Sequence, residues 1–412
     1  MANVSSSNGL EKRPKLRFPG FDEPWNTALL SDYFVKSTKK NSDGMISNVI
    51  CNSAKQGLIP QREYFDKDIA NSDNTNGYYI IESNDFVYNP RKSADAPYGP
   101  ISSYQYPEAG IVSPLYLCFR AKREINPFYF EWYFRSSTWH RYIYMSGDSG
   151  ARHDRVSIKD DVFFAMPINV PSAKEQERIS LFLDAIERRI ETQRTLVETL
   201  KKYKRGVISA LLSSKTNPYY SSKTWKEVAL CDVASGFEYG MNAAATVYDG
   251  SHKYIRITDI DDNSHLYSQD VPVSPEGQVD EKYRVRENDI LFARTGASVG
   301  KSYRYQRSDG DLYYAGFLIR IHVNSDMNCG YVFQNTLTEA YRRWVLLESA
   351  RSGQPGINAE QYKQYRFLLP PLELQNKIST LATNLDNLIC KEGNLLSQIE
   401  QVKIALLQRL FI

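Results

Sequence analysis

Two stretches of the chain place apolar residues at alternating steps of four and three along the sequence. The first runs from Ile179 to Leu211 and the second from Ile378 to Leu410. This heptad spacing predicts one long helix in each stretch, with a single apolar stripe that needs a partner helix. The economical solution is that the two helices pair with each other in antiparallel orientation.

The polar interruptions of the two stripes also coincide. Gln193 matches Glu392 and Lys204 matches Lys403, in each case 199 residues apart. An antiparallel pair would place Gln193 near Glu392, with Cα atoms within about 10 Å, and one polar layer of this kind can fix the register. The alternative is that each helix packs on its own globular domain, although such helices usually carry a wider apolar face.

The segments in front of the two helices are also repeated. Trp25–Asp32 and Trp225–Asp232 share Trp, Leu and Asp at an offset of 200 residues, and Tyr79–Val87 resembles Tyr283–Leu291 at an offset of 204. Repeats of this length indicate that the chain is built from two related halves.

Short β-branched and aromatic segments, bounded by Gly, Pro, Asn or Asp, predict strands. They are Tyr79–Tyr88, Ile111–Arg120, Tyr254–Thr258, Asp289–Arg294 and Phe317–Val323. Helices are expected between strands at Pro127–Thr138 and Tyr331–Glu348. The predicted class is α+β, with two pseudo-repeated globular α/β domains separated by a long antiparallel two-helix coiled coil.

We expect six segments along the chain. They are a flexible N-terminal segment (1–15), a first globular domain (16–170), a first long helix (171–213), a linker (214–223), a second globular domain (224–369) and a second long helix (370–412). Residues 1–15 lack the apolar region of a signal peptide, and no apolar run of about 18 residues predicts a membrane span.

Composition adds little to this picture. Lys and Arg number 51 against 48 Asp and Glu, so any basic surface must come from local clustering. The five cysteines are scattered and never form a Cys-x-x-Cys pair, which favours a reducing cytoplasm over a disulfide framework.

The chain shows no recognisable catalytic constellation. Gly296–Ser302 resembles a phosphate-binding loop, but it has three residues between the glycines where that loop has four. Asn126–Tyr129 lacks the second Pro of the Asn-Pro-Pro-Tyr motif of amino-methyltransferases. The five histidines have no metal-ligand spacing. We therefore expect no catalytic residue, no bound cofactor and no metal in this chain.

Basic, Gly-containing loops flanked by aromatic residues fall at corresponding places in the two halves. Arg, Lys, Ser, Thr and Gln contact phosphates and read base edges, with Arg suited to guanine and Lys to phosphate. Ordinary solvated turns would have the same composition. The candidate DNA-binding residues are Arg91, Lys92, Tyr98, Arg152, His153 and Arg155, and then Arg294, Thr295, Ser298, Lys301, Arg304, Arg351 and Gln354.

The repeated helical motif resembles the specificity subunits of Type I restriction-modification enzymes. In each half a Pro-x-x-x-x-Gln-x-x-Ile motif (Pro171–Ile179 and Pro370–Ile378) leads into the long helix, and the first helix ends in Arg205–Leu212. Asn288–Gly296 is also similar to that family. The resemblance covers the chain from about Leu16 to Ile412.

The resemblance implies a non-catalytic DNA-recognition subunit. Each globular half would be a target-recognition domain that reads one part of a bipartite site, and the helices would set the spacing and dock two modification (methyltransferase) subunits. S-adenosylmethionine would belong to those subunits, and ATP and magnesium to restriction subunits that join the complex. Because Pro90–Tyr106 has no counterpart after Arg294, the two halves should read different sequences. The alternatives are a coiled-coil scaffold without sequence-specific DNA binding and, less well supported by motifs, a self-contained methyltransferase.

Overall fold

The protein is described here by a computed structural model that covers residues 13–64, 75–147, 154–350 and 355–412. Its contacts divide the chain into two compact units. Unit 1 comprises Met1–Arg194 with Asn394–Ile412, and unit 2 comprises Thr195–Gly393. Each unit thus combines one globular half with part of each long helix. Within the described ranges, none of the helices combines the length and the apolarity that crossing a membrane requires.

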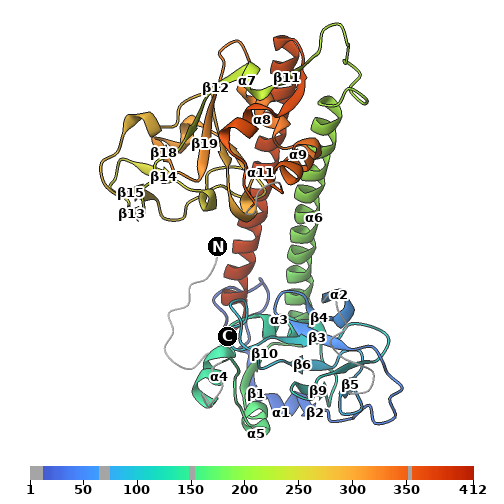
Figure 1. The fold of residues 1–412 in the computed structure, drawn as a ribbon. Helices are drawn as coiled ribbons and strands as arrows, with labels where there is room; N and C mark the ends of the chain where they lie inside the picture. Colours follow the sequence, from blue (N-terminus) through green and yellow to red (C-terminus); the bar gives the residue numbers. More distant parts are fainter. Residues whose placement is uncertain (1–12, 65–74, 148–153, 351–354) are drawn as a thin grey trace. The chain divides into compact units, whose positions relative to one another are not determined.

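The globular part of unit 1 mixes short strands with short helices (Figure 1). Its elements are β1 (Asn26–Leu29), α1 (Leu30–Tyr33), β2 (Phe34–Lys36), β3 (Ile50–Ser53), β4 (Gly57–Pro60), α2 (Gln61–Tyr64), β5 (Tyr79–Ile81), β6 (Phe86–Tyr88), β7 (Ile101–Ser103), β8 (Gly110–Val112), β9 (Leu117–Ala121), α3 (Pro127–Arg135), α4 (His140–Ser146), α5 (Asp160–Phe164) and β10 (Pro167–Val170).

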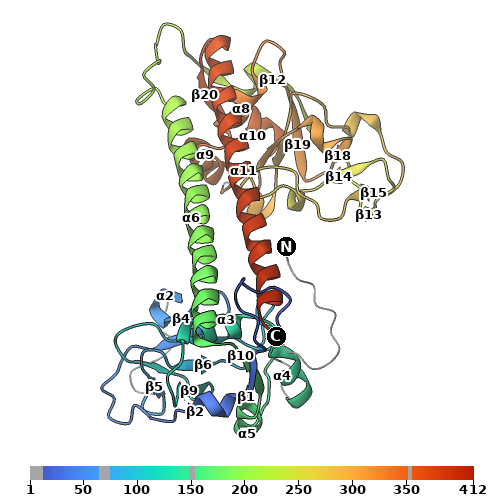
Figure 2. The same ribbon diagram turned by 180° about the vertical axis from the view of Figure 1, so that it is seen from behind.

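The globular part of unit 2 is built in the same way, and Figure 2 shows its strands from behind. Its elements are β11 (Lys226–Ala229), α7 (Leu230–Val233), β12 (Ala234–Tyr239), β13 (Ala245–Val247), β14 (Lys253–Ile255), β15 (Val273–Pro275), β16 (Asp289–Ala293), β17 (Ser302–Arg304), β18 (Leu312–Tyr314), β19 (Leu318–Val323), α8 (Cys329–Asn335), α9 (Glu339–Ser349), α10 (Ala359–Lys363) and β20 (Arg366–Leu369).

A four-stranded antiparallel sheet forms the centre of each globular part. Its strand order is β2-β9-β6-β7 in unit 1 and β12-β19-β16-β17 in unit 2, so the two sheets match strand for strand. A two-stranded ribbon also recurs, since β1 pairs with β10 as β11 pairs with β20. The halves differ outside these sheets, because β5 and β8 are antiparallel whereas β14 and β18 are parallel.

The repeated sequence motifs have structural roles. The ring of Trp25 in unit 1, like that of Trp225 in unit 2, is buried at the start of the ribbon. The repeated Asp caps the short helix that follows: Asp32 accepts a hydrogen bond from the backbone N–H of Leu29 at 2.7 Å, and Asp232 accepts one from Ala229 at 2.8 Å. Both motifs therefore fix the point at which the chain enters the sheet.

A second motif explains why the predicted strand at 79–88 is broken in two. Asn84 has a φ of 68° and Asn288 a φ of 69°, a left-handed conformation that Asn tolerates better than most residues. In each half the Asp that follows accepts a backbone N–H from three residues earlier. The turn ends β5 at Ile81 and starts β6 at Phe86.

The long helices are α6 (Ala173–Leu211) and α11 (Leu372–Leu410), as the heptad pattern predicts. The Gln of the Pro-x-x-x-x-Gln motif ties the first turn of each helix to the Pro that precedes it. Gln176 Nε2 donates to the carbonyl of Pro171 at 2.9 Å, and Gln375 Nε2 donates to that of Pro370 at 2.8 Å.

Within unit 1 the first part of α6 packs antiparallel to the last part of α11. Lys403 pairs with Glu187 and Arg194 with Glu400, both at 2.8 Å. The apolar side chains between them join a large aromatic core, to which Leu410 of α11 and the next residue, Phe411, also belong.

Unit 2 repeats this arrangement with the other parts of the two helices. Lys204 pairs with Asp386 at 2.6 Å, and Ile208 and Leu212 share one apolar core with Ile378 and Ala382. The matched lysines of the two stripes therefore have matched carboxylate partners. The predicted α+β class, with repeated halves and antiparallel helices, is confirmed.

Candidate nucleic-acid interface

In unit 1 the candidate loops are held together by their backbones. The loop between β6 and β7 runs from Asn89 to Pro100, and Arg91 forms a β-bridge with Arg155. The N–H of Lys92 donates to the carbonyl of Asp154 at 2.8 Å, and the N–H of Val156 donates to that of Pro90 at 2.9 Å. The cations of two distant segments, Arg91, Lys92 and Arg155, are thus brought into one surface.

Two of the candidates in this half, Arg152 and His153, lie outside the described residues. They immediately precede Asp154, whose carbonyl is bonded to the loop between β6 and β7. Arg91 and Lys92 are exposed, and no ion pair involves either of them within the described parts of unit 1. They are therefore available to an external anion.

Tyr98 is half-buried and supports the loop. Its ring lies 4.9 Å from that of His140 on α4, and its carbonyl accepts the hydroxyl of Tyr88 at 2.8 Å. Burial lowers the pKa of His140, so its ring is neutral near pH 7. Gly99 follows with a φ of +81°, and a Cβ there would lie 2.1 Å from the carbonyl oxygen of Asn89. This glycine allows the loop to close.

Unit 2 joins its candidate loops in the same manner. Thr295, in the loop between β16 and β17, forms a β-bridge with Gly356, and the N–H of Gly296 donates to the carbonyl of Pro355 at 3.2 Å. The carbonyl of Arg294 accepts the N–H of Ile357 at 2.9 Å. Two further candidates of this half, Arg351 and Gln354, precede Pro355 and lie outside the described residues.

Arg294 is partly held by an aromatic ring. Its guanidinium carbon lies 4.8 Å from the centre of the Tyr239 ring, and the Tyr239 hydroxyl accepts the N–H of Ala359 at 3.2 Å. A guanidinium over a ring keeps its edge free for hydrogen bonds. Ser298 lies in the 3-10 turn of the same loop, and its carbonyl accepts the N–H of Lys301.

Lys301 and Arg304 have intramolecular partners that the sequence did not indicate. The Lys301 ammonium donates to the carbonyl of Ile260 at 2.9 Å and pairs with Asp262, and only 11% of the side chain is exposed. Arg304 lies with its guanidinium carbon 5.8 Å from the Phe333 ring on α8. The structure leaves DNA contact by these residues untested, but it gives both a structural role.

The expectation that Pro90–Tyr106 has no counterpart is wrong. The pairing of Phe86 with Ser103 matches that of Ile290 with Arg304, so the loop between β6 and β7 corresponds to the loop between β16 and β17. The second loop is shorter, and residues 101–103 form a strand inside the segment that had been taken as an insertion. The halves differ in loop length, on a common framework.

Buried ion pairs lie on the strands that carry the loops, and they differ between the halves. Asp85 is 1% exposed and binds Arg120 through two bonds of 2.6 Å. Asp289 is 2% exposed and binds His322 Nδ1 at 2.8 Å. Burial raises the pKa of Asp289, although the His322 ring opposes this shift.

Sequence reasoning also missed exposed apolar pairs at the ends of two corresponding helices. Tyr144 and Met145 on α4 are 69% and 73% exposed, and Leu346 and Leu347 on α9 are 64% and 70% exposed. A buried residue precedes each pair, and a candidate DNA loop follows each helix. The signal was two consecutive large side chains directly after a buried apolar residue near the end of each helix.

The comparisons with known proteins agree with this architecture. Residues 222–401 match the family described as Type I restriction modification DNA specificity domain. The specificity subunit of the Type I restriction enzyme StySPI from Salmonella potsdam is 23% identical over 309 residues. This match covers 71% of the present chain and spans 66% of the length of that relative.

Residues 222–401 thus match the Type I specificity family, and the chain as a whole is similar to one of its members. The resemblance seen in its helical motifs is thereby confirmed. Two solved structures share the fold. One comes from work on complex assembly and conformational transition of the type I R-M system. It is 15% identical with a TM-score of 0.58, and the match covers 96% of this chain and 99% of that chain. The other, the S subunit of M. genitalium, is 13% identical with a TM-score of 0.56, covering 97% and 99%.

Proposed function

We propose that this specificity-family chain is the DNA sequence-recognition subunit of a Type I restriction-modification complex and has no catalytic site of its own. The observation that carries the proposal is the duplicated loop pairing. Arg91 bridges Arg155 in unit 1 as Thr295 bridges Gly356 in unit 2, at the same edge of matching sheets. Each half therefore presents two neighbouring loops with basic and polar side chains.

These paired loops suit DNA for physical reasons. Cations without an ion-pair partner among the described residues, such as Arg91 and Lys92, can bind phosphates. A guanidinium held over a ring, such as that of Arg294, presents its edge to guanine. Because the two halves have the same framework but different loop lengths and residues, each reads a different part of a bipartite, asymmetric site.

The partners follow from this division of labour. The chain binds double-stranded DNA and docks two modification subunits, which flip an adenine out of the duplex and methylate it with S-adenosylmethionine. Restriction subunits, with ATP and magnesium, join complexes that also cut DNA. Such a complex works in the cytoplasm.

An exchange of recognition halves tests the proposal. Replacing residues 16–170 by the equivalent segment of another family member should change one half of the methylated site, read by methylome sequencing of cells that express the complex. The donor segment must accept Leu410 and Phe411, because these residues belong to the unit 1 core. An equivalent exchange of residues 224–369 should change the other half alone.

Binding assays separate the proposal from the scaffold alternative. Gel shifts with the modification subunits present should show a preference for the methylated sequence over a scrambled duplex. A scaffold without DNA function would show equal, weak binding to both. A change in both half-sites after a single exchange would contradict modular recognition.

A further inference from the structure

Three side chains of unit 2 belong to one end of its central sheet, and together they are called the Arg294 cluster. Tyr239 ends β12, Phe317 directly precedes β19, and Arg294 directly follows β16. These strands are neighbours in the order β12-β19-β16. The candidate DNA loop between β16 and β17 begins at the same end of the sheet.

The guanidinium of Arg294 is held in place but keeps its donors available. Its carbon atom lies 4.8 Å from the centre of the Tyr239 ring, and the Tyr239 hydroxyl accepts the N–H of Ala359 at the start of α10. Backbone hydrogen bonds to Phe317 and Ile357 fix Arg294 on both sides. Within the described residues no hydrogen bond or ion pair involves its side chain, so the edge of the guanidinium can bind an external acceptor.

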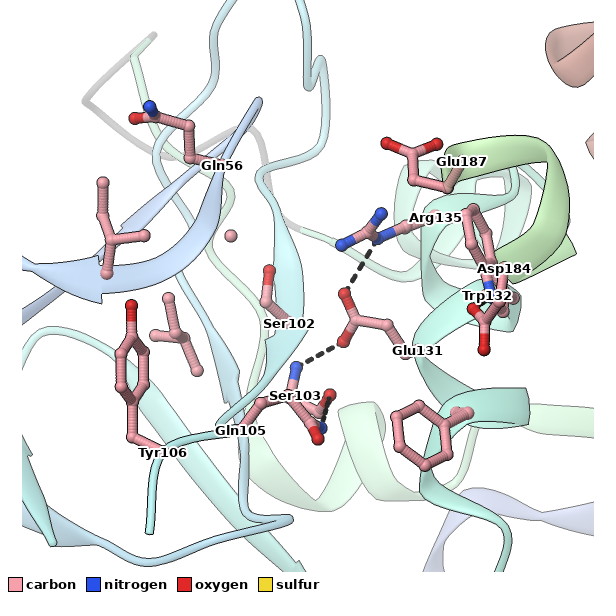
Figure 3. Close-up of a pocket in the computed structure, with 14 residues that line it drawn as sticks. Gln56, Ser102, Ser103, Gln105, Tyr106, Glu131, Trp132, Arg135, Asp184 and Glu187 are labelled. Atoms are coloured by element: carbon pink, nitrogen blue, oxygen red, sulfur yellow. Dashed lines mark hydrogen bonds and ion pairs between the residues drawn. The ribbon is translucent and has the colours of Figure 1, made fainter. Parts of the chain in front are cut away.

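An arginine that lies over a ring is not always available in this way. Figure 3 shows Arg135 in a pocket of unit 1, where its guanidinium carbon lies 5.0 Å from the centre of the Trp132 ring. The Nε of Arg135 donates to Glu131 at 2.8 Å, so this guanidinium already has a carboxylate partner within the chain. Arg294 has the ring without the carboxylate, which is the arrangement expected of a residue that binds a ligand.

Phe317 adds an exposed apolar surface beside this guanidinium. Its side chain is 62% exposed, and that of Tyr239 is 42% exposed. The 3.0 Å bond from the N–H of Arg294 to the carbonyl of Phe317 continues the register of β16 with β19, and directly opposite residues in a sheet lie about 5 Å apart. Because successive base pairs are about 3.4 Å apart, the two side chains can reach neighbouring base pairs.

We propose that the Arg294 cluster reads a guanine and a thymine of the neighbouring base pair, an inference that rests on the proposed function. The arginine fork matches the O6 and N7 acceptors of guanine in the major groove, and the Phe317 ring matches the 5-methyl group of thymine. Tyr239 acts through Arg294 as a positioning residue, because its ring holds the guanidinium in one plane.

Unit 1 has no equivalent of this cluster. The strand registers match Pro90 with Arg294 and Leu115 with Phe317. Pro90 has no side-chain donor, whereas Leu115 is apolar and 59% exposed. The cluster therefore belongs to the half-site of unit 2 alone, and Leu115→Ala is a matched control in the other half.

The test uses the full chain with its modification subunits and the site found by methylome sequencing. The half-site that changes on exchange of residues 224–369 should contain a guanine beside a base pair with thymine. In synthetic duplexes each guanine of this half-site is replaced in turn by 7-deazaguanine, which lacks the N7 acceptor, and each thymine by uracil, which lacks the methyl group. Fluorescence anisotropy should find one guanine whose replacement weakens binding about ten-fold and a neighbouring thymine whose replacement weakens it about four-fold.

Variants assign these two losses to residues. Arg294→Ala should bind the guanine and 7-deazaguanine duplexes equally, and Phe317→Ala should bind the thymine and uracil duplexes equally while it still responds to 7-deazaguanine. Tyr239→Leu should reduce the response to 7-deazaguanine, and Tyr239→Phe, which keeps the ring, should restore most of it. Leu115→Ala should keep both responses. Thermal melting checks that each variant folds; if Tyr239→Leu does not fold, Arg294→Ala and Phe317→Ala decide.

The outcomes separate this inference from the proposed function. If the wild-type complex prefers its site but Arg294→Ala still responds to 7-deazaguanine, or Phe317→Ala still distinguishes thymine from uracil, the assignment of the cluster is wrong and the proposed function stands. A half-site without a guanine beside a base pair with thymine would also overturn the assignment. If the wild-type complex prefers no sequence, the proposed function fails and the assignment fails with it.

Discussion

Asp85 and Asp289 occupy the same place in the two halves but have different partners. Arg120 binds Asp85 through two bonds, whereas His322 binds Asp289 through one. The residue opposite the buried Asp therefore decides how many hydrogen bonds hold its carboxylate.

Replacing Arg120 by His should make unit 1 pH-sensitive. A His beside the Asp85 carboxylate has a pKa raised above its unfolded value of about 6.5, so its pairing is fully present below that pH and is lost as pH rises through the folded pKa. At pH 8 the replacement should lower the free energy of unfolding by about 1–2 kcal/mol. This value is kept small because the Arg120 side chain is 42% exposed. Thermal melting at pH 6 and pH 8 measures it. Equal losses at both pH values would contradict the argument.

Lys301 provides a prediction that separates a structural role from a DNA contact. Lys301→Ala removes the cation that binds the Ile260 carbonyl and Asp262, so it should destabilise the chain by roughly 1–3 kcal/mol. Thermal melting measures this loss. A phosphate contact would instead lower the salt slope of DNA binding by about one unit without a change in melting. The second outcome would restore the expectation drawn from sequence.

Replacing Arg294 should affect DNA binding and leave the stability of the chain almost unchanged. Its guanidinium touches the Tyr239 ring and no carboxylate within the described residues, so Arg294→Ala should leave the melting temperature within a degree or two. If Arg294 reads a base, the variant should lose roughly 1–3 kcal/mol of binding free energy on the cognate site and little on unrelated DNA. Fluorescence anisotropy with both duplexes measures this difference. Unchanged affinity for cognate DNA would place the contact surface elsewhere.

At the scale of elements, the long helices were predictable because their signal is repeated and periodic. The same contacts recur in both copies. Gln176 and Gln375 donate to the carbonyl of the Pro that precedes each helix, and Lys204 and Lys403 pair with carboxylates on the opposing helix. The predicted helix at 331–348 is interrupted instead, because the Thr338 side chain caps a new helix, α9.

The loops show why part of the site could not be predicted. Sequence composition placed basic loops at corresponding positions, but their pairing is made by backbone groups of Lys92, Asp154 and Gly356, which every residue possesses. The burial of Lys301 was equally hidden, since its partner carbonyl at Ile260 lies 41 residues away. Such contacts depend on the path of the chain, and no local pattern encodes that path.

The pairing of Gln193 with Glu392 stays a prediction, since the two residues belong to different units. Cysteines at both positions, in a chain with Cys231→Ser and Cys390→Ser, should be joined by a short bismaleimide in good yield if their Cα atoms lie within about 10 Å. Gel electrophoresis of protease fragments measures the product. Cysteines at positions 194 and 400, whose present side chains form an ion pair, are the positive control. Failure of the first pair alone would mean a different register.

At the scale of the whole molecule, each unit is assembled from both long helices. In unit 1 the core needs Leu406, Leu410 and Phe411 from α11. Their equivalents on α6, at an offset of 199 residues, are Val207, Leu211 and Leu212. A half-chain therefore lacks one helix but carries a related copy of it.

A fragment of residues 13–223 should accordingly form a homodimer in which each α6 supplies the missing helix to the other copy. Analytical ultracentrifugation should find twice the fragment mass, and the dimer should prefer a palindromic site made of the first half-site. Leu211→Asp, which places a charge in the exchanged core, should give monomers. A folded monomeric fragment would contradict the requirement for the second helix.

The division of the cores also sets an order of events during synthesis. Unit 2 is one continuous stretch of chain, Thr195–Gly393, whereas unit 1 waits for Asn394–Ile412. The half that leaves the ribosome first is thus the last to complete its core. Tyr129 and Tyr133, for example, cannot pack against the Phe411 ring until residue 411 has been translated. During that interval the apolar surface of the first half is open to misassembly, and nascent chains should depend on chaperones more at this stage than after release.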